Sequence, residues 1–309
     1  MPKLLFTTST FNLDNFTDRA AIELAGYEIV LNHYGKRLTE SQVGELLDDQ
    51  VVGMVAGVEP LTEAVIRGAK ALKVISRCGI GLDNVDIQFA KTKGISVFNT
   101  PNAPTLAVAE LTLAHILSLA RRVPECDRAI RQGRWQPLMG FLLARQTVGI
   151  IGFGRIGKMV AKLLHAFGAK ILVHDMLPMK AAEAIEIATL DELLAQSDIV
   201  TLHLPYGPTT HHFINAETLA QMKSNALLIN VARGGLIDED ALLSAIQAKR
   251  LGGVALDCFE EEPYTGPLLA CDRVQMTAHM GSYAQEARAM MEAEACTSLV
   301  HGLRQHGLF

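Results

Sequence analysis

The chain alternates short apolar runs with longer segments in which apolar residues recur every three or four positions. In the first hundred residues, the runs KLLFT, YEIVLN, VVGMVAG, LKVIS and ISVFN predict strands. Segments such as LTESQVGELLDDQ and NVDIQFAKTKG lie between these runs and predict amphipathic helices. This alternation is typical of a parallel sheet with crossover helices, so the region predicts one small α/β unit.

A second series of the same kind follows a break. The segment NTPNAPT interrupts the pattern with two prolines, and LAVAELTLAHILSLARRV after it predicts a long helix. Six further strands are predicted at TVGII, KILVHD, DIVTLHLP, NALLINVA, GGVALD and VQMTAHMG. The segment after Gly281 predicts a helix that packs back on the first unit. We therefore predict an α/β protein with two doubly wound parallel sheets, one in residues 1–100 and 282–309 and the other in residues 101–281.

Composition and charge narrow the class of protein. A chain of 309 residues with 49% hydrophobic and 20% charged residues fits two ordinary globular domains. The net charge of −5, without a basic stripe, predicts no nucleic-acid partner and no binding to an anionic membrane surface. The opening MPKLLFTTSTFN has too short an apolar run for a signal peptide, which predicts a cytoplasmic location.

The segment VGIIGFGRIGKMVAKLLHAFGAKILVHD contains a glycine-rich turn between a strand and a helix. Gly152, Gly154 and Gly157 have the spacing of a dinucleotide-binding site, in which the pyrophosphate lies at the helix N-terminus. Asp175 ends the next strand, where its carboxylate could accept hydrogen bonds from ribose hydroxyls and repel a 2′-phosphate. The pattern predicts NAD rather than NADP. A glycine-rich turn without a ligand is the alternative, which the surrounding strand, helix and acid disfavour.

Polar residues follow the later strands of the second series. His203, Arg233, Asp257 and His279 each stand at or just after the end of a predicted strand. Ligands of open α/β sheets bind beyond the carboxyl ends of the strands, so these residues are expected to border the cofactor. Arg233 carries a permanent charge and a fork of donors that suits a carboxylate, although a solvated surface arginine is the plainer interpretation.

Taken together, these motifs resemble those of a known enzyme family. The stretches GIGLDNVDIQFAKTKGISVFNTP, VAELTL, GRW, GIIGFGRIG, HLPYGPTT, INVARGGLIDEDAL, GVALDCFEEEP and AHMG resemble, in this order, the D-isomer-specific 2-hydroxyacid dehydrogenases. The resemblance implies a Rossmann cofactor domain, a flavodoxin-like substrate domain, an active site in the cleft between them and a homodimer built on the cofactor domain. The expected partner is a small anionic 2-hydroxy or 2-oxo acid.

The resemblance implies a catalytic role for three residues, with Arg233 binding the substrate, His279 acting as acid and base, and Glu262 as the carboxylate partner of the histidine. The chemistry of 2-oxo acid reduction requires a proton donor of this kind, whether or not the resemblance is considered. Reduction of a 2-oxo acid needs a hydride, which NADH supplies, and a proton, which a histidine can supply. From the residues alone, Glu260 or Glu261 in the same run FEEEP could replace Glu262.

The resemblance also extends the set of cofactor contacts along the matching motifs. Asp257 is implied to lie against the nicotinamide carboxamide, although it could instead cap local structure. The expected cofactor-binding residues are Gly152, Gly154, Arg155, Ile156, Gly157, Asp175, His203, Leu204, Pro205, Thr210, Val231, Ala232, Arg233, Asp257, His279 and Gly281.

The turn SRCGIGLDN resembles the substrate loop of the family, whose backbone N–H groups hold a carboxylate. Gly79 and Ile80 are therefore expected to bind substrate, together with Arg233 and His279. Arg77 could pair with a phosphate, which favours a substrate like that of phosphoglycerate dehydrogenase. Glyoxylate or hydroxypyruvate reduction is the nearest alternative, since a second cation expected near residue 56 is absent.

Two more distant functions remain open on the sequence. A phosphite dehydrogenase would use the same scaffold and cofactor for an inorganic anion. An NAD-sensing corepressor, a binding protein rather than an enzyme, also resembles this family. The short termini and the presence of Arg233, Glu262 and His279 disfavour the corepressor.

No metal site is expected. The five cysteines are scattered without a C-x-x-C pair, which disfavours both a zinc knuckle and a disulfide framework. His211 and His212 form a pair, but the sequence around them offers no further set of ligands, so they are interpreted as surface residues.

Overall fold

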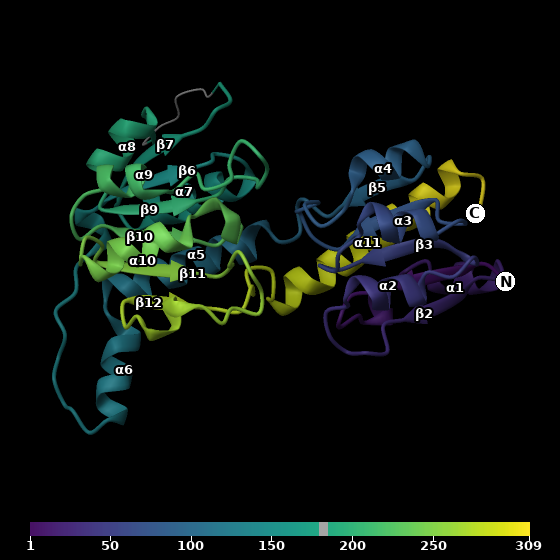
Figure 1. Cartoon of the computed structure of the whole chain (residues 1–309), viewed down its shortest axis with the longest axis horizontal. Coiled ribbons are helices and arrows are strands. Elements are labelled where there is room, and N and C mark those ends of the chain that lie inside the picture. Colours follow the sequence, from purple (N-terminus) through teal and green to yellow (C-terminus); the bar gives the residue numbers. More distant parts are fainter. Residues whose placement is uncertain (179–184) are drawn as a thin grey trace. The chain divides into compact units, whose positions relative to one another are not determined.

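The computed structural model describes residues 1–178 and 185–309, which form two compact units (Figure 1). Unit 1 comprises Met1–Pro104 and Ser282–Phe309, and unit 2 comprises Thr105–Gly281. Unit 1 is thus built from two stretches of chain that all of unit 2 separates in the sequence. Among the described residues, no helix combines the length and the apolar character needed to cross a lipid bilayer.

Unit 1 contains a five-stranded parallel sheet with the order β2-β1-β3-β4-β5, the flavodoxin-like arrangement. All five strands predicted for this region are present. They are β1 (Lys3–Phe6), β2 (Glu28–Leu31), β3 (Val51–Ala56), β4 (Val74–Arg77) and β5 (Ser96–Asn99). The helices of the unit are α1 (Arg19–Leu24), α2 (Glu40–Leu46), α3 (Glu63–Gly68), α4 (Ile87–Thr92) and α11 (Gln285–Gln305).

Unit 2 contains a seven-stranded parallel sheet with the order β12-β11-β10-β9-β6-β7-β8 in its described residues. The strands are β6 (Thr147–Ile151), β7 (Lys170–His174), β8 (Ile185–Ile187), β9 (Ile199–Leu202), β10 (Leu227–Asn230), β11 (Gly253–Leu256) and β12 (Val274–Met276). The helices are α5 (Thr105–Ala120), α6 (Val123–Arg131), α7 (Arg155–Ala166), α8 (Leu190–Gln196), α9 (Ala216–Gln221) and α10 (Glu239–Gln247). The predicted fold class of two doubly wound parallel sheets is confirmed.

The sequence prediction missed β8. This strand has three residues, lies at the edge of the sheet and has no fully buried side chain. It therefore lacks the apolar run by which the other strands of unit 2 were found, because an edge position does not require burial on both faces.

Each sheet has an apolar core on both faces. In β6, Ile150 belongs to one cluster of buried side chains and Ile151 to the other. Successive side chains of a strand point to opposite faces, so a strand covered on both sides reads as one continuous apolar run. The four residues of β9, β10 and β11 are all buried, which is the physical reason that these strands stood out in the sequence.

Helix α11 completes the core of unit 1, where it packs against β3, β4 and β5. Ala295, Leu299 and Leu303 lie on its buried side and are fully shielded from solvent. Burial of a leucine side chain contributes roughly 1.5–3 kcal/mol to stability. The last helix of the chain is therefore a core element of a unit whose sheet comes entirely from the first hundred residues.

The order of the strands in unit 2 places a switch point beside β6. The chain runs outward from β6 through β7 to β8, then returns to β9 on the other side of β6. At such a point the segments that leave the two central strands diverge, which opens a crevice at the carboxyl ends of the strands where open α/β sheets bind ligands. A cofactor site is therefore expected at the segments that follow β6 and β9.

Candidate active site

The turn after β6 requires glycine at two positions. Gly152 has a φ of 93°, and a Cβ there would lie 2.5 Å from the carbonyl oxygen of His203 at the end of β9. A Cβ at Gly157 would collide with the carbonyl oxygen of Gly152. Because neither position can accept a side chain, α7 starts directly against the strand ends, while Gly154 and Arg155 at its N-terminus are exposed.

Asp175 lies beside this turn. Its Oδ2 accepts a hydrogen bond from the backbone N–H of Phe153 at 2.6 Å, and its Oδ1 accepts one from Leu177 at 2.9 Å. The carboxylate thus stands next to the glycine turn, one strand away from β6. A bare backbone cradle at a helix N-terminus with an acid beside it fits the pyrophosphate and a ribose diol of NAD.

The segment after β9 carries His203, Leu204, Pro205 and Thr210. Burial lowers the pKa of His203 to about 3, and its Nε2 lies 3.0 Å from the hydroxyl oxygen of Thr201. Thr210 is buried, donates to the carbonyl oxygen of Pro205 at 2.8 Å and accepts from the N–H of Gly207 at 3.0 Å. His203 is therefore a neutral imidazole, and Thr210 holds the loop closed.

Arg233 stands in the segment after β10, and a buried asparagine organises its backbone. The side-chain amide of Asn230 accepts from the N–H of Ala232 at 3.0 Å and donates to the carbonyl oxygen of Arg233 at 2.8 Å. One guanidinium nitrogen of Arg233 donates to the carbonyl oxygen of Ala232 at 2.8 Å. Gly234 follows, and a Cβ there would collide with the backbone of Phe259.

Asp257 shapes the turn that carries His279. Its carboxylate is fully buried and accepts from the Thr277 hydroxyl at 2.5 Å, from the N–H of Met280 at 2.9 Å and from the N–H of Gly281 at 2.8 Å. The N–H of His279 donates to the backbone carbonyl of Asp257 at 2.7 Å, and His279 adopts a φ of 52°. Asp257 therefore fixes the local backbone that presents His279.

Glu262 contacts the imidazole of His279. The Nδ1 atom of His279 lies 2.9 Å from Oε2 and 3.1 Å from Oε1 of the carboxylate, and both residues are half-buried. The carboxylate also accepts from the N–H of Phe259 at 3.2 Å. With Nδ1 directed at Glu262, the other ring nitrogen, Nε2, is the atom placed to exchange a proton with a bound molecule. Glu260 of the same run contacts His212 instead.

Sequence reasoning missed several polar residues that support this region. Asn230 fixes the backbone at Arg233, and the Thr277 hydroxyl donates to the Asp257 carboxylate. His115 of α5 lies 3.2 Å from the same hydroxyl. Burial lowers the pKa of His115. The thiol of Cys258 donates to the carbonyl oxygen of Ala232 at 3.5 Å, which connects the segments after β10 and β11. A polar residue at the end of an otherwise apolar strand, as in LLIN, was the signal available for Asn230.

The residues expected to bind substrate in unit 1 lie after β4. Arg77 is buried, and its guanidinium donates to the carbonyl oxygen of Cys78 and lies against Gly79. The N–H of Gly79 donates to the carbonyl oxygen of Arg77 at 2.9 Å, and the carbonyl of Ile80 accepts from the Asn99 amide at 2.7 Å. The loop is thus held by hydrogen bonds within itself and by one from Asn99 of β5, and the Arg77 guanidinium faces the loop backbone.

Comparison with known proteins gives one consistent family. Residues 113–281 match the model of the D-isomer specific 2-hydroxyacid dehydrogenase NAD binding domain. The chain is 42% identical over 258 residues to a D-3-phosphoglycerate dehydrogenase of Methanocaldococcus jannaschii, a match that covers 81% of this chain and 49% of the relative. It is 37% identical over 283 residues to a hydroxypyruvate reductase of Thermotoga maritima, with 90% and 92% covered.

Solved structures agree with these relatives. The crystal structure of a glyoxylate reductase from Paecilomyes thermophila has a TM-score of 0.88 and 27% identity, and covers 99% of this chain and 96% of its own. A D-lactate dehydrogenase from Aquifex aeolicus, complexed with NAD and lactic acid, has a TM-score of 0.85 and 30% identity over 99% and 96% of the two chains. The chain spans about half the length of the phosphoglycerate dehydrogenases that it matches. The glycine turn, the ordered strand ends and these matches agree, and the chain belongs to the NAD-binding D-isomer-specific 2-hydroxyacid dehydrogenase family.

Proposed function

We propose that the protein transfers a hydride between NAD(H) and a small 2-hydroxy or 2-oxo acid. The observation that carries this proposal is the contact of Glu262 with Nδ1 of His279, at the same edge of the sheet as the glycine turn after β6. One titratable ring oriented by a carboxylate is the arrangement that general acid–base catalysis requires. NAD supplies the hydride chemistry when bound.

His279 handles the proton in this scheme. During reduction, Nε2–H gives its proton to the carbonyl oxygen of the substrate as the carbonyl carbon receives the hydride, and the ring becomes neutral. During oxidation, neutral Nε2 removes the hydroxyl proton, and the imidazolium that forms is stabilised by the Glu262 carboxylate at Nδ1. Glu262 thus fixes both the ring orientation and the tautomer.

Arg233 binds the substrate in the same scheme. Its guanidinium is half-buried, and Asn230 fixes its backbone through two hydrogen bonds. A permanent charge of this kind can pair with the substrate carboxylate and favour developing negative charge on the carbonyl oxygen. It also decides which face of the substrate meets the nicotinamide, because a carboxylate held at one point leaves the carbonyl little freedom to turn.

Turnover by purified protein tests the proposal directly. NADH oxidation with a panel of 2-oxo acids, followed by absorbance, is compared between the wild type, His279→Ala and the matched control His165→Ala, an exposed histidine of α7. We expect kcat to fall about 10²–10⁴-fold in His279→Ala and to stay unchanged in the control. NADH binding should be nearly the same in all three proteins. Unchanged turnover in His279→Ala would remove this residue from the acid–base role.

For the substrate we propose a phosphorylated 2-oxo acid of the kind reduced by phosphoglycerate dehydrogenases. Relatives of that name and the position of Arg77 in the substrate loop support this choice. A second candidate is glyoxylate or hydroxypyruvate, which is favoured by the donation of Arg77 to the carbonyl oxygen of Cys78 and by the hydroxypyruvate reductase relative. In that case Arg77 is a structural residue of the loop.

Side-by-side kinetics separate the two candidates. A kcat/KM at least about tenfold higher for 3-phosphohydroxypyruvate than for hydroxypyruvate and glyoxylate supports the phosphorylated substrate. Arg77→Lys should then lose most of this preference. Equal or higher values for the unphosphorylated acids assign the enzyme to the second candidate.

We also propose that residues 101–281 form the NAD-binding domain and that residues 1–100 and 282–309 form the substrate domain of a cytoplasmic homodimer. The family resemblance supports the dimer, whose interface would lie on the NAD-binding domain. Light scattering of the purified protein measures its mass, and a mass equal to one chain of 33.5 kDa would contradict the dimer.

A further inference from the structure

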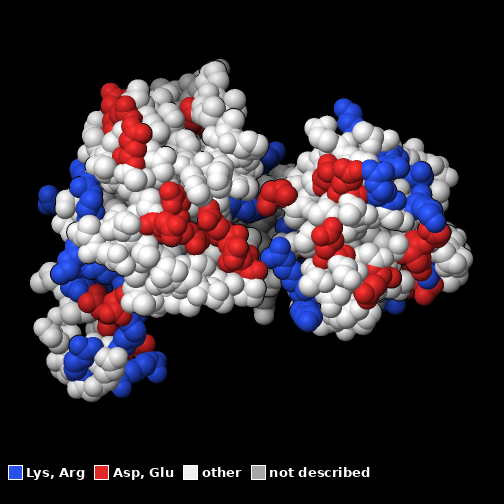
Figure 2. Space-filling view, in the orientation of Figure 1, with Lys and Arg blue, Asp and Glu red and all other residues white. Residues whose placement is uncertain are grey.

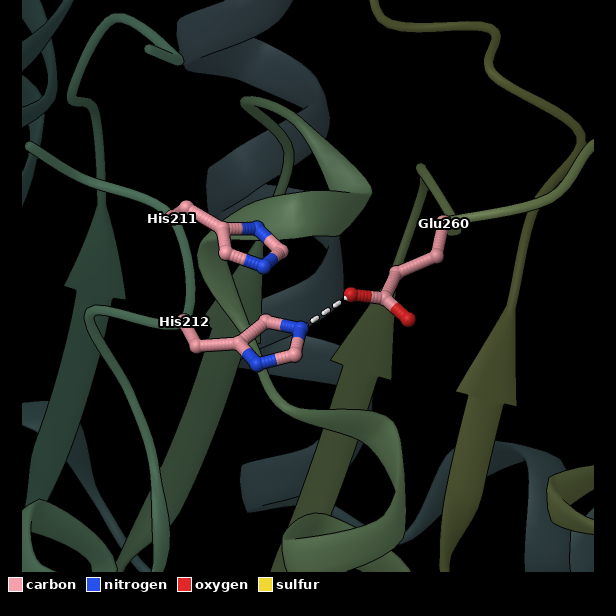
Figure 3. A group of neighbouring side chains, drawn as sticks. All are labelled: His211, His212 and Glu260. Carbon is pink, nitrogen blue, oxygen red and sulfur yellow. Dashed lines mark hydrogen bonds and ion pairs between the residues drawn. The ribbon is translucent and has the colours of Figure 1, made fainter. Parts of the chain in front are cut away.

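His211, His212 and Glu260 form a cluster outside the proposed reaction site (Figure 3). The two histidines lie in the loop after β9, and the glutamate lies in the loop after β11. Each residue offers one nitrogen or oxygen atom, and these three atoms all lie within 4.8 Å of one another. Nε2 of His212 contacts Oε1 of Glu260, and the two imidazole rings are stacked with centroids 3.8 Å apart. The strands therefore bring together side chains that are distant in sequence.

The three side chains have the donor types of a transition-metal site. Two imidazole nitrogens and one carboxylate oxygen suit Zn²⁺, Co²⁺, Ni²⁺ or Cu²⁺, whereas Mg²⁺ and Ca²⁺ prefer oxygen ligands alone. Sequence reasoning dismissed the histidine pair because no further ligand was found near it. In the structure, a third side chain with a ligand atom, Glu260, lies beside the pair and comes from a different strand end.

The backbone around the cluster is already fixed. The N–H of His212 donates to the carbonyl oxygen of Gly235 at 2.8 Å, and the N–H of Glu260 donates to Oε1 of Glu239 at 3.0 Å. Small adjustments of three side chains, rather than of the loops, would bring the ligand atoms to bonding distance. Such preorganisation reduces the conformational entropy that binding must overcome.

A neighbour orients the more exposed histidine. The hydroxyl oxygen of Tyr206 lies 3.2 Å from Nδ1 of His211. When Nδ1 donates to this oxygen, the lone pair of the ring is on Nε2, which is then available to a metal ion. Outer hydrogen bonds of this kind fix the tautomer of most metal-binding histidines.

The surrounding charge also favours a cation. The carboxylate of Glu239 accepts a hydrogen bond from the backbone N–H of Glu260, and Asp240 and Glu261 are the next residues in the sequence after this pair. Figure 2 shows acidic side chains gathered over the α10 and β11 region of unit 2. A divalent ion between these loops would offset the repulsion among the carboxylates.

We propose that His211, His212 and Glu260 bind one divalent transition-metal ion, with water completing its coordination. The site does not depend on the reaction assigned to the protein. An ion there connects the loop after β9 with the loop after β11, and these loops carry Thr210 and Glu262. The bound ion thus reduces the freedom of two segments that border the proposed cofactor and proton-transfer sites.

Metal binding to the substrate-free protein tests the proposal. The chain is treated with EDTA, freed of the chelator and titrated with Ni²⁺, Co²⁺ or Zn²⁺ in a calorimeter, and Mg²⁺ serves as the control ion. We expect one tightly bound transition-metal ion per chain, no comparable binding of Mg²⁺, and a Co²⁺ absorption spectrum typical of nitrogen and oxygen ligands. His211→Ala and Glu260→Gln should each weaken binding at least about tenfold, and Tyr206→Phe should weaken it less.

Two control variants make the result specific to this cluster. His165→Ala removes an exposed histidine of α7. Cys258→Ala breaks the other group of described residues that could hold a metal, Cys258, Glu262 and His279. Both variants should bind the ion like the wild type. The proposal is overturned if the wild type binds no transition metal, if His211→Ala and Glu260→Gln bind as well as the wild type, or if Cys258→Ala alone abolishes binding. Circular dichroism of each variant verifies that the fold is retained.

Discussion

The half-buried imidazole of His203 predicts that acid destabilises the folded protein through one identifiable group. Burial lowers the pKa of His203 from 6.5 to about 3 in the folded chain. Above 6.5 neither state binds the proton, so this histidine does not change stability there. Below that value His203 binds a proton in the unfolded chain but not in the folded chain. The free energy of unfolding therefore falls by about 1.4 kcal/mol for each pH unit of acidification. Between pH 7.5 and pH 4.5 the expected loss is about 2.7 kcal/mol.

Replacement of the titrating group tests this magnitude. His203→Gln keeps a polar side chain beside Thr201 but cannot become charged, so its unfolding free energy should depend less on pH by about 2.7 kcal/mol over the same interval. Urea unfolding followed by circular dichroism at several pH values gives both curves. His115, whose pKa burial also lowers, is present in both proteins and cancels in the comparison. His165→Gln, at an exposed position, should behave like the wild type, and parallel curves for His203→Gln and the wild type would refute the reasoning.

Three further changes have defined outcomes. Gly157→Ala should weaken NADH binding at least about tenfold, because its methyl group displaces the turn at Gly152, whereas Gly44→Ala, with open space around it, should bind NADH normally in a fluorescence titration. Asp175→Ala should raise the kcat/KM for NADPH relative to NADH, and an unchanged ratio would contradict the assigned ribose contact. Leu299→Ala should lower the unfolding free energy by about 2–5 kcal/mol in urea, since this side chain is fully buried under the sheet of unit 1.

Much of the fold could be predicted because each buried strand is a short run of mostly apolar residues. Strands such as β9 and β10 are covered on both faces, so all four residues of each are buried and three of the four are apolar. The glycines of the turn after β6 were equally visible, since the close approach of backbone leaves no space for another residue type. The edge strand β8 has no buried residue and left no such pattern.

The site was harder to predict because its contacts join distant segments. Sequence reasoning from the residues alone left Glu260, Glu261 and Glu262 as alternatives, and the geometry separates Glu260 at His212 from Glu262 at His279. The hydrogen bond from Thr277 to Asp257 likewise joins residues that follow two neighbouring strands, β12 and β11. Periodicity along the chain carries no information on such pairs, which depend on the register of neighbouring strands.

Unit 1 is assembled from two stretches of chain that are far apart in the sequence. It therefore cannot complete its fold during synthesis before unit 2 has also been made. Residues 1–104 emerge first, but the sheet face that α11 covers stays exposed until the segment from Ser282 onward has been made. Unit 2 is a continuous stretch and can close its core before that point. Domains usually fold in N-terminal to C-terminal order during synthesis. In this chain we expect the opposite order, with unit 2 folding before unit 1. Until α11 has been made, the nascent N-terminal region presents an apolar surface of the kind that chaperones bind.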